Sequence, residues 1–140
     1  INDDWQLAIK HQAYGVHLGQ EDLNEANIEE IYQSGLRLGV STHCEEEIAR
    51  AIALHPSYIA YGPIYPTTSK IMRFAPQGLE KLKLLKKRLP YPLVAIGGIN
   101  FDRIDDIIAT EVDGIALISA ITEARDPIEM TQKLLDRLSL

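Results

Sequence analysis

The chain has 140 residues, of which 46% are hydrophobic and 24% charged, and a formal net charge of −6 at pH 7. These proportions exclude a disordered or collagen-like chain. The acidic balance argues against nucleic-acid binding, because phosphate backbones require clustered Lys and Arg, and the one basic cluster (81–88) has the spacing of a helix surface. The sequence has no apolar run of about 20 residues, so no membrane span is expected.

Predicted strands and helices alternate along the chain. The strands are continuous apolar runs, which is typical of strands buried on both faces in a parallel sheet. The helices carry apolar residues three and four positions apart, on one face. In chain order the elements are strand Tyr14–Leu18, helix Asn27–Gln33, strand Leu36–Val40, helix Glu45–Leu54, strand Tyr58–Ile64, helix Leu79–Leu89, strand Leu93–Ile96, helix Phe101–Ala109, strand Gly114–Ile118 and helix Ile128–Leu138.

This repetition of β/α units, without a linker, predicts one α/β domain over residues 1–140. The repeat alone does not separate a closed barrel from an open doubly wound sheet. In both architectures the catalytic and ligand-binding residues lie at the carboxyl ends of the strands.

Cys44 is the only cysteine, so an internal disulfide is excluded and a cytoplasmic location is expected. Its neighbour His43 suggests a thiolate nucleophile, but an inert thiol is the favoured interpretation, since adjacent residues on a strand face opposite ways. The histidines do not fall at zinc-ligand spacings. His17 and His43 are interpreted as hydrogen-bonded structural residues.

Three groups of residues at predicted strand ends are candidates for binding phosphate and metal. Gly97-Gly98 and Ser119 offer backbone amides and a hydroxyl to a phosphate, although paired glycines also make simple turns. The stretch 67–70 supplies three hydroxyls and an ammonium, or is a solvated loop. Asp3 and Asp22 offer hard oxygen ligands for Mg²⁺, or are ordinary loop and cap residues.

In order and spacing, these segments resemble the thiamine phosphate synthase family from end to end. Each motif is weak by itself, but the ordered set is specific. The matching stretches are Ile1–Trp5, Gly15–Leu23, Leu38–His43, Gly62–Lys70, Ala75–Leu79, Val94–Ile99 and Ser119–Ile121.

The resemblance implies a (β/α)₈ TIM barrel, of which this chain covers about the last five β/α units. It also implies a transferase of thiamine biosynthesis, which joins a hydroxymethylpyrimidine pyrophosphate to a thiazole phosphate and releases pyrophosphate. By the resemblance, Mg²⁺ is the cofactor, Asp3 and Asp22 are its ligands, and Ser41 and Lys70 are the catalytic residues. The substrate-binding residues it implies are Asn2, Ser41, Thr67, Thr68, Ser69, Lys70, Gly98, Ile118 and Ser119.

The same resemblance predicts that the 140 residues are part of a longer polypeptide and have little activity alone, because five strands cannot close an eight-stranded barrel. Two alternative functions stay open: a thiazole tautomerase on the same fold, and a non-catalytic phosphate-binding fragment. The expected partners are the two small-molecule substrates, with assembly into a homo-oligomer left open.

Overall fold

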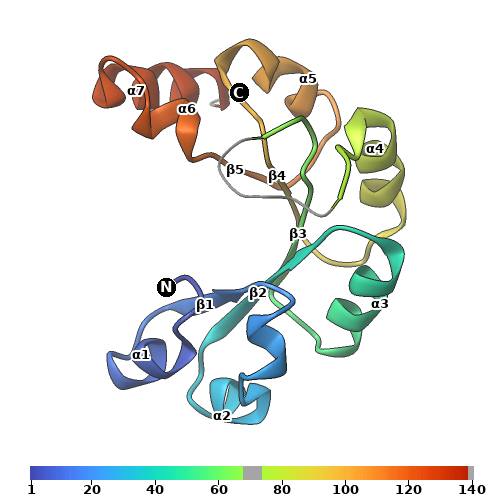
Figure 1. Ribbon diagram of the computed structural model, residues 1–140, viewed down its shortest axis with the longest axis vertical. Coiled ribbons are helices and arrows are strands. Elements are labelled where there is room, and N and C mark those ends of the chain that lie inside the picture. The colour runs from blue at the N-terminus through green and yellow to red at the C-terminus, as the bar shows by residue number, and fades with distance from the viewer. Residues whose placement is uncertain (68–73, 139–140) are drawn as a thin grey trace. The chain divides into compact units, whose positions relative to one another are not determined.

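The computed structural model describes residues 1–67 and 74–138 (Figure 1). The chain divides into two compact units, Ile1–Ala60 and Tyr61–Leu140. The strands follow one another in chain order, β1-β2-β3-β4-β5, and helices lie between them in the sequence. Such crossover connections are what parallel strands require. The predicted α/β class is therefore confirmed, whereas a single domain over 1–140 stays a prediction.

The first unit is built around β1 (Gly15–Leu18) and β2 (Arg37–Thr42), which pair in parallel from Gly15↔Arg37 to Leu18↔Val40. Its helical elements are α1 (Trp5–Lys10), η1 (Asp22–Asn24), α2 (Ile28–Gln33) and α3 (Glu45–Ala53). Both α2 and α3 contact β2 (Figure 1). The fully buried side chains of this unit include Leu18, Ile31, Leu38 and Ile59. Burying each such side chain stabilises the fold by about 1.5–3 kcal/mol.

The first three residues run alongside β1. The backbone N–H of His17 donates to Ile1 O at 2.9 Å, and the N–H of Asp3 donates to His17 O at 2.9 Å. Asn2 forms a parallel bridge with His17. This ladder places Asn2 and Asp3 next to β1, three and two residues before α1 begins at Trp5.

The second unit is built around β4 (Leu93–Ile96) and β5 (Gly114–Ala116), which pair in parallel from Val94↔Gly114 to Ile96↔Ala116. Its helical elements are α4 (Gly78–Arg88), η2 (Phe101–Arg103), α5 (Ile104–Ile108), α6 (Ser119–Thr122) and α7 (Pro127–Leu138). The helix α7 contacts α5 and α6 (Figure 1). The fully buried side chains of this unit include Ile64, Leu82, Leu93, Ile104 and Ile107.

Several predicted boundaries need correction. β2 continues to Thr42, so Ser41 lies inside the strand instead of after it. β3 (Tyr58–Tyr61) ends before the predicted Ile64, at Gly62-Pro63, where proline has no N–H for the ladder. The helix predicted over 101–109 is a 3₁₀ turn followed by α5.

Within the part of the chain that the structure describes, no helix has both the length and the apolar character needed to cross a membrane.

Asp113 joins two elements of the second unit through its carboxylate. Its Oδ2 accepts hydrogen bonds from Lys86 Nζ at 2.6 Å and from the backbone N–H of Leu93 at 2.7 Å. Partial burial raises the pKa of this carboxyl, but the hydrogen bonds from Lys86 and Leu93 outweigh it and leave the pKa below its ordinary value. Asp113 therefore stabilises the fold above its unfolded pKa of about 3.9, and this contribution is lost as the pH falls through the lower folded pKa.

We expect Asp113→Asn to lower the free energy of unfolding by about 1 kcal/mol at pH 7, because the charged acceptor is lost while solvent screens the half-exposed pair. Urea denaturation of the native polypeptide at pH 7 and pH 3 measures this. Asp105→Asn is the control, since its carboxylate pairs with Arg137 at 2.6 Å on the surface. An equal loss of unfolding free energy in both variants at pH 7 would contradict the stabilising role of the Asp113 carboxylate.

Candidate functional site

The side chain of Ser41 is held by a histidine on the neighbouring strand. His17, on β1, lies within hydrogen-bond distance of two hydroxyls: its Nε2 is 2.8 Å from Ser41 Oγ and its Nδ1 is 2.8 Å from Tyr58 OH. The His17 and Tyr58 rings also stack at 5.6 Å between centroids. Since β1 and β2 pair in parallel, the strand register brings His17 and Ser41 to the same end of the sheet.

His17 is neutral near pH 7. Burial lowers the pKa of the imidazole, and the nearby Asp22 carboxylate opposes this only in part. A neutral imidazole has one donor and one acceptor nitrogen, so one of the two hydroxyls donates to it and the other accepts from it. The interpretation of His17 as a hydrogen-bonded residue is confirmed, and its partner turns out to be a predicted site residue.

Asp22 lies at the start of η1, directly after the loop that follows β1. Its Oδ2 accepts a hydrogen bond from the backbone N–H of Gly19 at 2.9 Å, which fixes the carboxylate against the loop. The next residue of that loop, Gln20, donates from Nε2 to Ser41 O at 2.7 Å. Arg50 on α3 donates in turn to Gln20 Oε1 at 3.4 Å and to Asn24 Oδ1 at 2.8 Å. This network joins the end of β1 to the end of β2.

Asp3 and Asp22 both interact with His17: the backbone N–H of Asp3 donates to His17 O, and the Asp22 carboxylate acts on the imidazole through its charge. Asp3 has a left-handed backbone, with φ of 64°. Among residues 1–67 and 74–138, no group of three or more His, Cys, Asp or Glu side chains is arranged to hold a metal. Carboxylate oxygens are the kind of ligand that suits Mg²⁺, which proteins commonly bind through one or two carboxylates together with waters and substrate phosphates, so Asp3 and Asp22 stay the predicted ligands.

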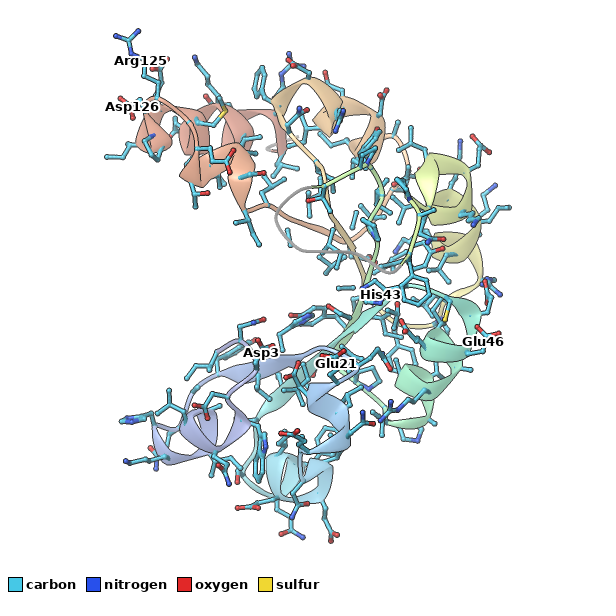
Figure 2. All side chains as sticks on the ribbon, in the orientation of Figure 1. Asp3, Glu21, His43, Glu46, Arg125 and Asp126 are labelled. Carbon is cyan, nitrogen blue, oxygen red and sulfur yellow. The ribbon has the colours of Figure 1, made fainter. Side chains whose placement is uncertain are left out.

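Cys44 and His43 have separate roles. Cys44 is the N-cap residue of α3, not a strand residue as expected. Partial burial and the adjacent Glu46 and Glu47 raise the pKa of its thiol, which disfavours the reactive thiolate. His43 instead contacts Glu47, whose Oε2 is 2.8 Å from both Nδ1 and the backbone N of His43, while Glu46 is exposed (Figure 2).

In the second unit, the Gly97-Gly98 turn after β4 packs against the loop after β3. Both glycines have positive φ, 89° for Gly97 and 67° for Gly98. A Cβ on Gly98 would lie 2.4 Å from Pro66 O and 2.8 Å from Tyr65 O, so no side chain fits there. The backbone N–H of Tyr65 donates to Gly97 O at 3.1 Å. Glycine is therefore needed both for the backbone conformation and for the close approach of the two loops.

This contact brings Thr67, which follows Pro66, close to Gly98. Ile118 and Ser119 follow β5, and the pairing Ile96↔Ala116 puts them at the same end of the sheet as Gly98. Ser119 is the first residue of α6, and the Ile118 side chain is 67% exposed. The predicted residues Thr68, Ser69 and Lys70 lie outside the described residues.

The predicted site residues thus form two sets. Asn2, Asp3, Asp22 and Ser41 belong to the first unit, and Thr67, Gly98, Ile118 and Ser119 belong to the second. The sequence interpretation missed the residues that support them: Gln20, Tyr58 and Arg103. Gln20 had a usable signal, since it follows Gly19 at a strand end. Arg103 donates a hydrogen bond to Gly98 O, only five residues away, whereas Tyr58 is 41 residues from His17.

Five strands in chain order with helices between them define an α/β fold, and folds of this class place their functional residues at the carboxyl ends of the strands. Comparison with known proteins identifies the family. The profile described as thiamine monophosphate synthase matches residues 1–121, and the chain belongs to that family.

Individual relatives agree with this assignment. The thiamine-phosphate synthase of Photorhabdus laumondii is 58% identical over 136 residues, covering 96% of this chain and 63% of the relative. That of Proteus mirabilis is 57% identical over 137 residues, covering 97% of this chain and 64% of the relative. The solved thiamine phosphate pyrophosphorylase of Pyrococcus furiosus superposes with a TM-score of 0.81 at 34% identity, covering 96% of this chain and 64% of that one. The chain spans somewhat under two thirds of these relatives, and the prediction of a partial TIM barrel is confirmed.

Proposed function

We propose that the polypeptide containing this chain is a thiamine phosphate synthase. It joins 4-amino-2-methyl-5-hydroxymethylpyrimidine pyrophosphate to 4-methyl-5-(2-hydroxyethyl)thiazole phosphate, giving thiamine phosphate and pyrophosphate. The observation that carries this proposal is the identity of 58% to a thiamine-phosphate synthase over nearly the whole chain. Both substrates carry phosphate charges that membranes exclude, so the reaction belongs in the cytoplasm.

Four residues of the first unit, together with Lys70 from outside the described residues, handle the pyrimidine pyrophosphate in this proposal. Asn2 contacts the pyrimidine, Ser41 and Lys70 bind the pyrophosphate, and Asp3 and Asp22 hold Mg²⁺. The hydrogen bond between His17 and Ser41 supports this role for Ser41, because it fixes the hydroxyl in one orientation. The metal would neutralise charge on the pyrophosphate oxygens as the leaving group departs.

The loops of the second unit bind the thiazole phosphate. Thr67, Thr68 and Ser69 supply hydroxyls, Gly98 and Ser119 supply backbone amides, and the exposed Ile118 contacts the apolar thiazole. The positive φ of both Gly97 and Gly98 supports this assignment, since successive backbone N–H groups in such turns can form a concavity that binds anions.

The chemistry requires no strong nucleophile from the protein. An electron-rich aminopyrimidine stabilises the methylene cation that forms as pyrophosphate leaves, and the thiazole nitrogen then donates its electron pair to that carbon. The protein orients the two substrates and neutralises charge. A neutral His17 and a protonated Cys44 are compatible with this mechanism, since neither has to act as a base or nucleophile.

The test is product formation by the native polypeptide that contains these residues. Supplied with both substrates and Mg²⁺, it should form thiamine phosphate and pyrophosphate in equal amounts, measured by chromatography and ³¹P NMR. A thiazole tautomerase would instead isomerise a thiazole carboxylate phosphate without any pyrimidine substrate. Isomerisation without coupling would contradict the proposal.

A further inference from the structure

One arginine side chain donates a hydrogen bond to the backbone of the Gly97-Gly98 turn. Arg103, the last residue of η2, donates from Nη1 to Gly98 O at 2.6 Å. The contact is partly buried, and a charged donor makes it stronger than an ordinary amide hydrogen bond. The hydrogen bond joins Arg103 to a predicted substrate-binding residue.

The same guanidinium also contacts the loop after β3. Its central carbon lies 4.7 Å from the centroid of the Tyr65 ring, within the range of a cation–π interaction. The Tyr65 hydroxyl is buried and has no hydrogen-bond partner among the residues that the structure describes. The ring of Tyr65, not its hydroxyl, is therefore what Arg103 uses.

These two contacts fix a peptide plane. Because a trans peptide is planar, holding the carbonyl of Gly98 also sets the direction of the Ile99 N–H, which points to the opposite side. Gly98 alone could not hold this orientation, since its positive φ of 67° reflects the freedom of a residue without Cβ. The stacked Tyr65 keeps the guanidinium in place and ties it to the loop that leads into Thr67.

We propose that Arg103 is a positioning residue for the thiazole phosphate site: it clamps the Gly97-Gly98 turn to the Tyr65 loop, so that the backbone N–H of Ile99 faces the substrate phosphate. This inference rests on the proposed function. It assigns Arg103 no contact with substrate. Its effect passes through Gly98 and Tyr65, and it concerns the thiazole substrate and not the pyrimidine one.

Lysine cannot replace this arginine. A guanidinium is planar and can stack on a ring while donating a hydrogen bond in its own plane, whereas an ammonium is a compact charge on a flexible stem. Arg103→Lys should therefore behave like Arg103→Ala. We expect both variants to raise KM for the thiazole phosphate about tenfold with kcat nearly unchanged, because the loss affects substrate and transition state alike.

The experiment measures kcat and both KM values for the native polypeptide and five variants: Arg103→Ala, Arg103→Lys, Tyr65→Leu, Tyr65→Phe and Arg137→Ala. Tyr65→Leu should reproduce the arginine variants, and Tyr65→Phe should match the wild type, because it removes only the unpartnered hydroxyl. Arg137→Ala is the matched control: Arg137 lies over the Phe101 ring at 5.5 Å and pairs with Asp105, away from the turn.

A selective rise in the thiazole phosphate KM supports the inference. An unchanged KM in Arg103→Lys, equal rises in both KM values, or the same rise in Arg137→Ala would overturn it. If the wild type forms no thiamine phosphate, the proposed function fails and inorganic phosphate becomes the probe. A phosphate-induced rise in Tm that Arg103→Lys abolishes and Arg137→Ala retains would still support the clamp, and equal rises in all three proteins would overturn it.

Discussion

Asp22→Asn should lower kcat by about 10³-fold, since one carboxylate of the proposed Mg²⁺ site is lost where charge builds up on the departing pyrophosphate. The asparagine keeps an oxygen that can accept the hydrogen bond from the Gly19 N–H, which is 2.9 Å from Asp22 Oδ2. The loop after β1 should therefore keep its conformation. Raising the Mg²⁺ concentration should restore part of the activity, because the variant binds the ion more weakly.

The control is Glu21→Gln, which removes the same charge from the adjacent residue (Figure 2). Glu21 is exposed, and no metal role is proposed for it. Steady-state rates over a Mg²⁺ series compare the two variants. Should Asp22→Asn retain more than a third of wild-type kcat, the metal assignment would be wrong, and a metal-free activity such as thiazole tautomerisation would become the better proposal.

Gly98→Ala is expected to damage both stability and binding. A Cβ there would meet the carbonyl oxygens of Pro66 and Tyr65 at 2.4 and 2.8 Å, and the backbone has φ of 67°. The conformation alone costs about 1–2 kcal/mol for a residue with a side chain, and forced packing adds about 1–3 kcal/mol. We expect the free energy of unfolding to fall by about 3 kcal/mol and the thiazole phosphate KM to rise about 100-fold, as the two loops move apart.

Gly78→Ala is the control that separates the cost of the positive φ from the cost of steric overlap with the neighbouring loop. Gly78 has nearly the same φ, 76°, but a Cβ there would have no neighbour within 4 Å. The free energy of unfolding of this variant should fall by about 1 kcal/mol, and its KM for the thiazole phosphate should equal that of the wild type. Urea denaturation and initial rates measure the two effects. Equal losses of stability in both variants, or an unchanged KM in Gly98→Ala, would contradict the packing of the two loops as the reason for glycine at 98.

The parts of the fold that the sequence predicted well are those with strong local signals. The apolar run Leu93–Ile96 matches β4 to the residue. By contrast, α1 was not predicted, because its six residues are too few to show a helical period. Its N-cap is Asp4, whose side chain accepts a hydrogen bond from the Leu7 N–H at 2.8 Å. The 3₁₀ turn η1 and the four-residue α6 were missed for the same reason.

The site was predictable as a set of strand-end residues but not as a network. Ser41 and Gly98 were identified from their positions. The contact of His17 with Ser41 spans 24 residues and leaves no local pattern, whereas the contact of Arg103 with Gly98 spans five residues and depends on the conformation of the turn between them. Cys44 shows the opposite case. The sequence favoured an inert thiol on strand geometry, and the thiol is disfavoured as a nucleophile for another reason, the burial and acidic neighbours that raise its pKa.

Asp3 and Asp22 of the first unit and the Gly97-Gly98 turn of the second are proposed to serve the Mg²⁺-dependent coupling of two phosphorylated substrates. The most direct test is thiamine phosphate formation by the native polypeptide containing this chain, with Mg²⁺ and with EDTA. We predict stoichiometric product with Mg²⁺ and a loss of at least 100-fold with EDTA, as expected for electrostatic stabilisation of a pyrophosphate leaving group. A folded protein that forms no product, or forms it equally well in EDTA, would contradict the account.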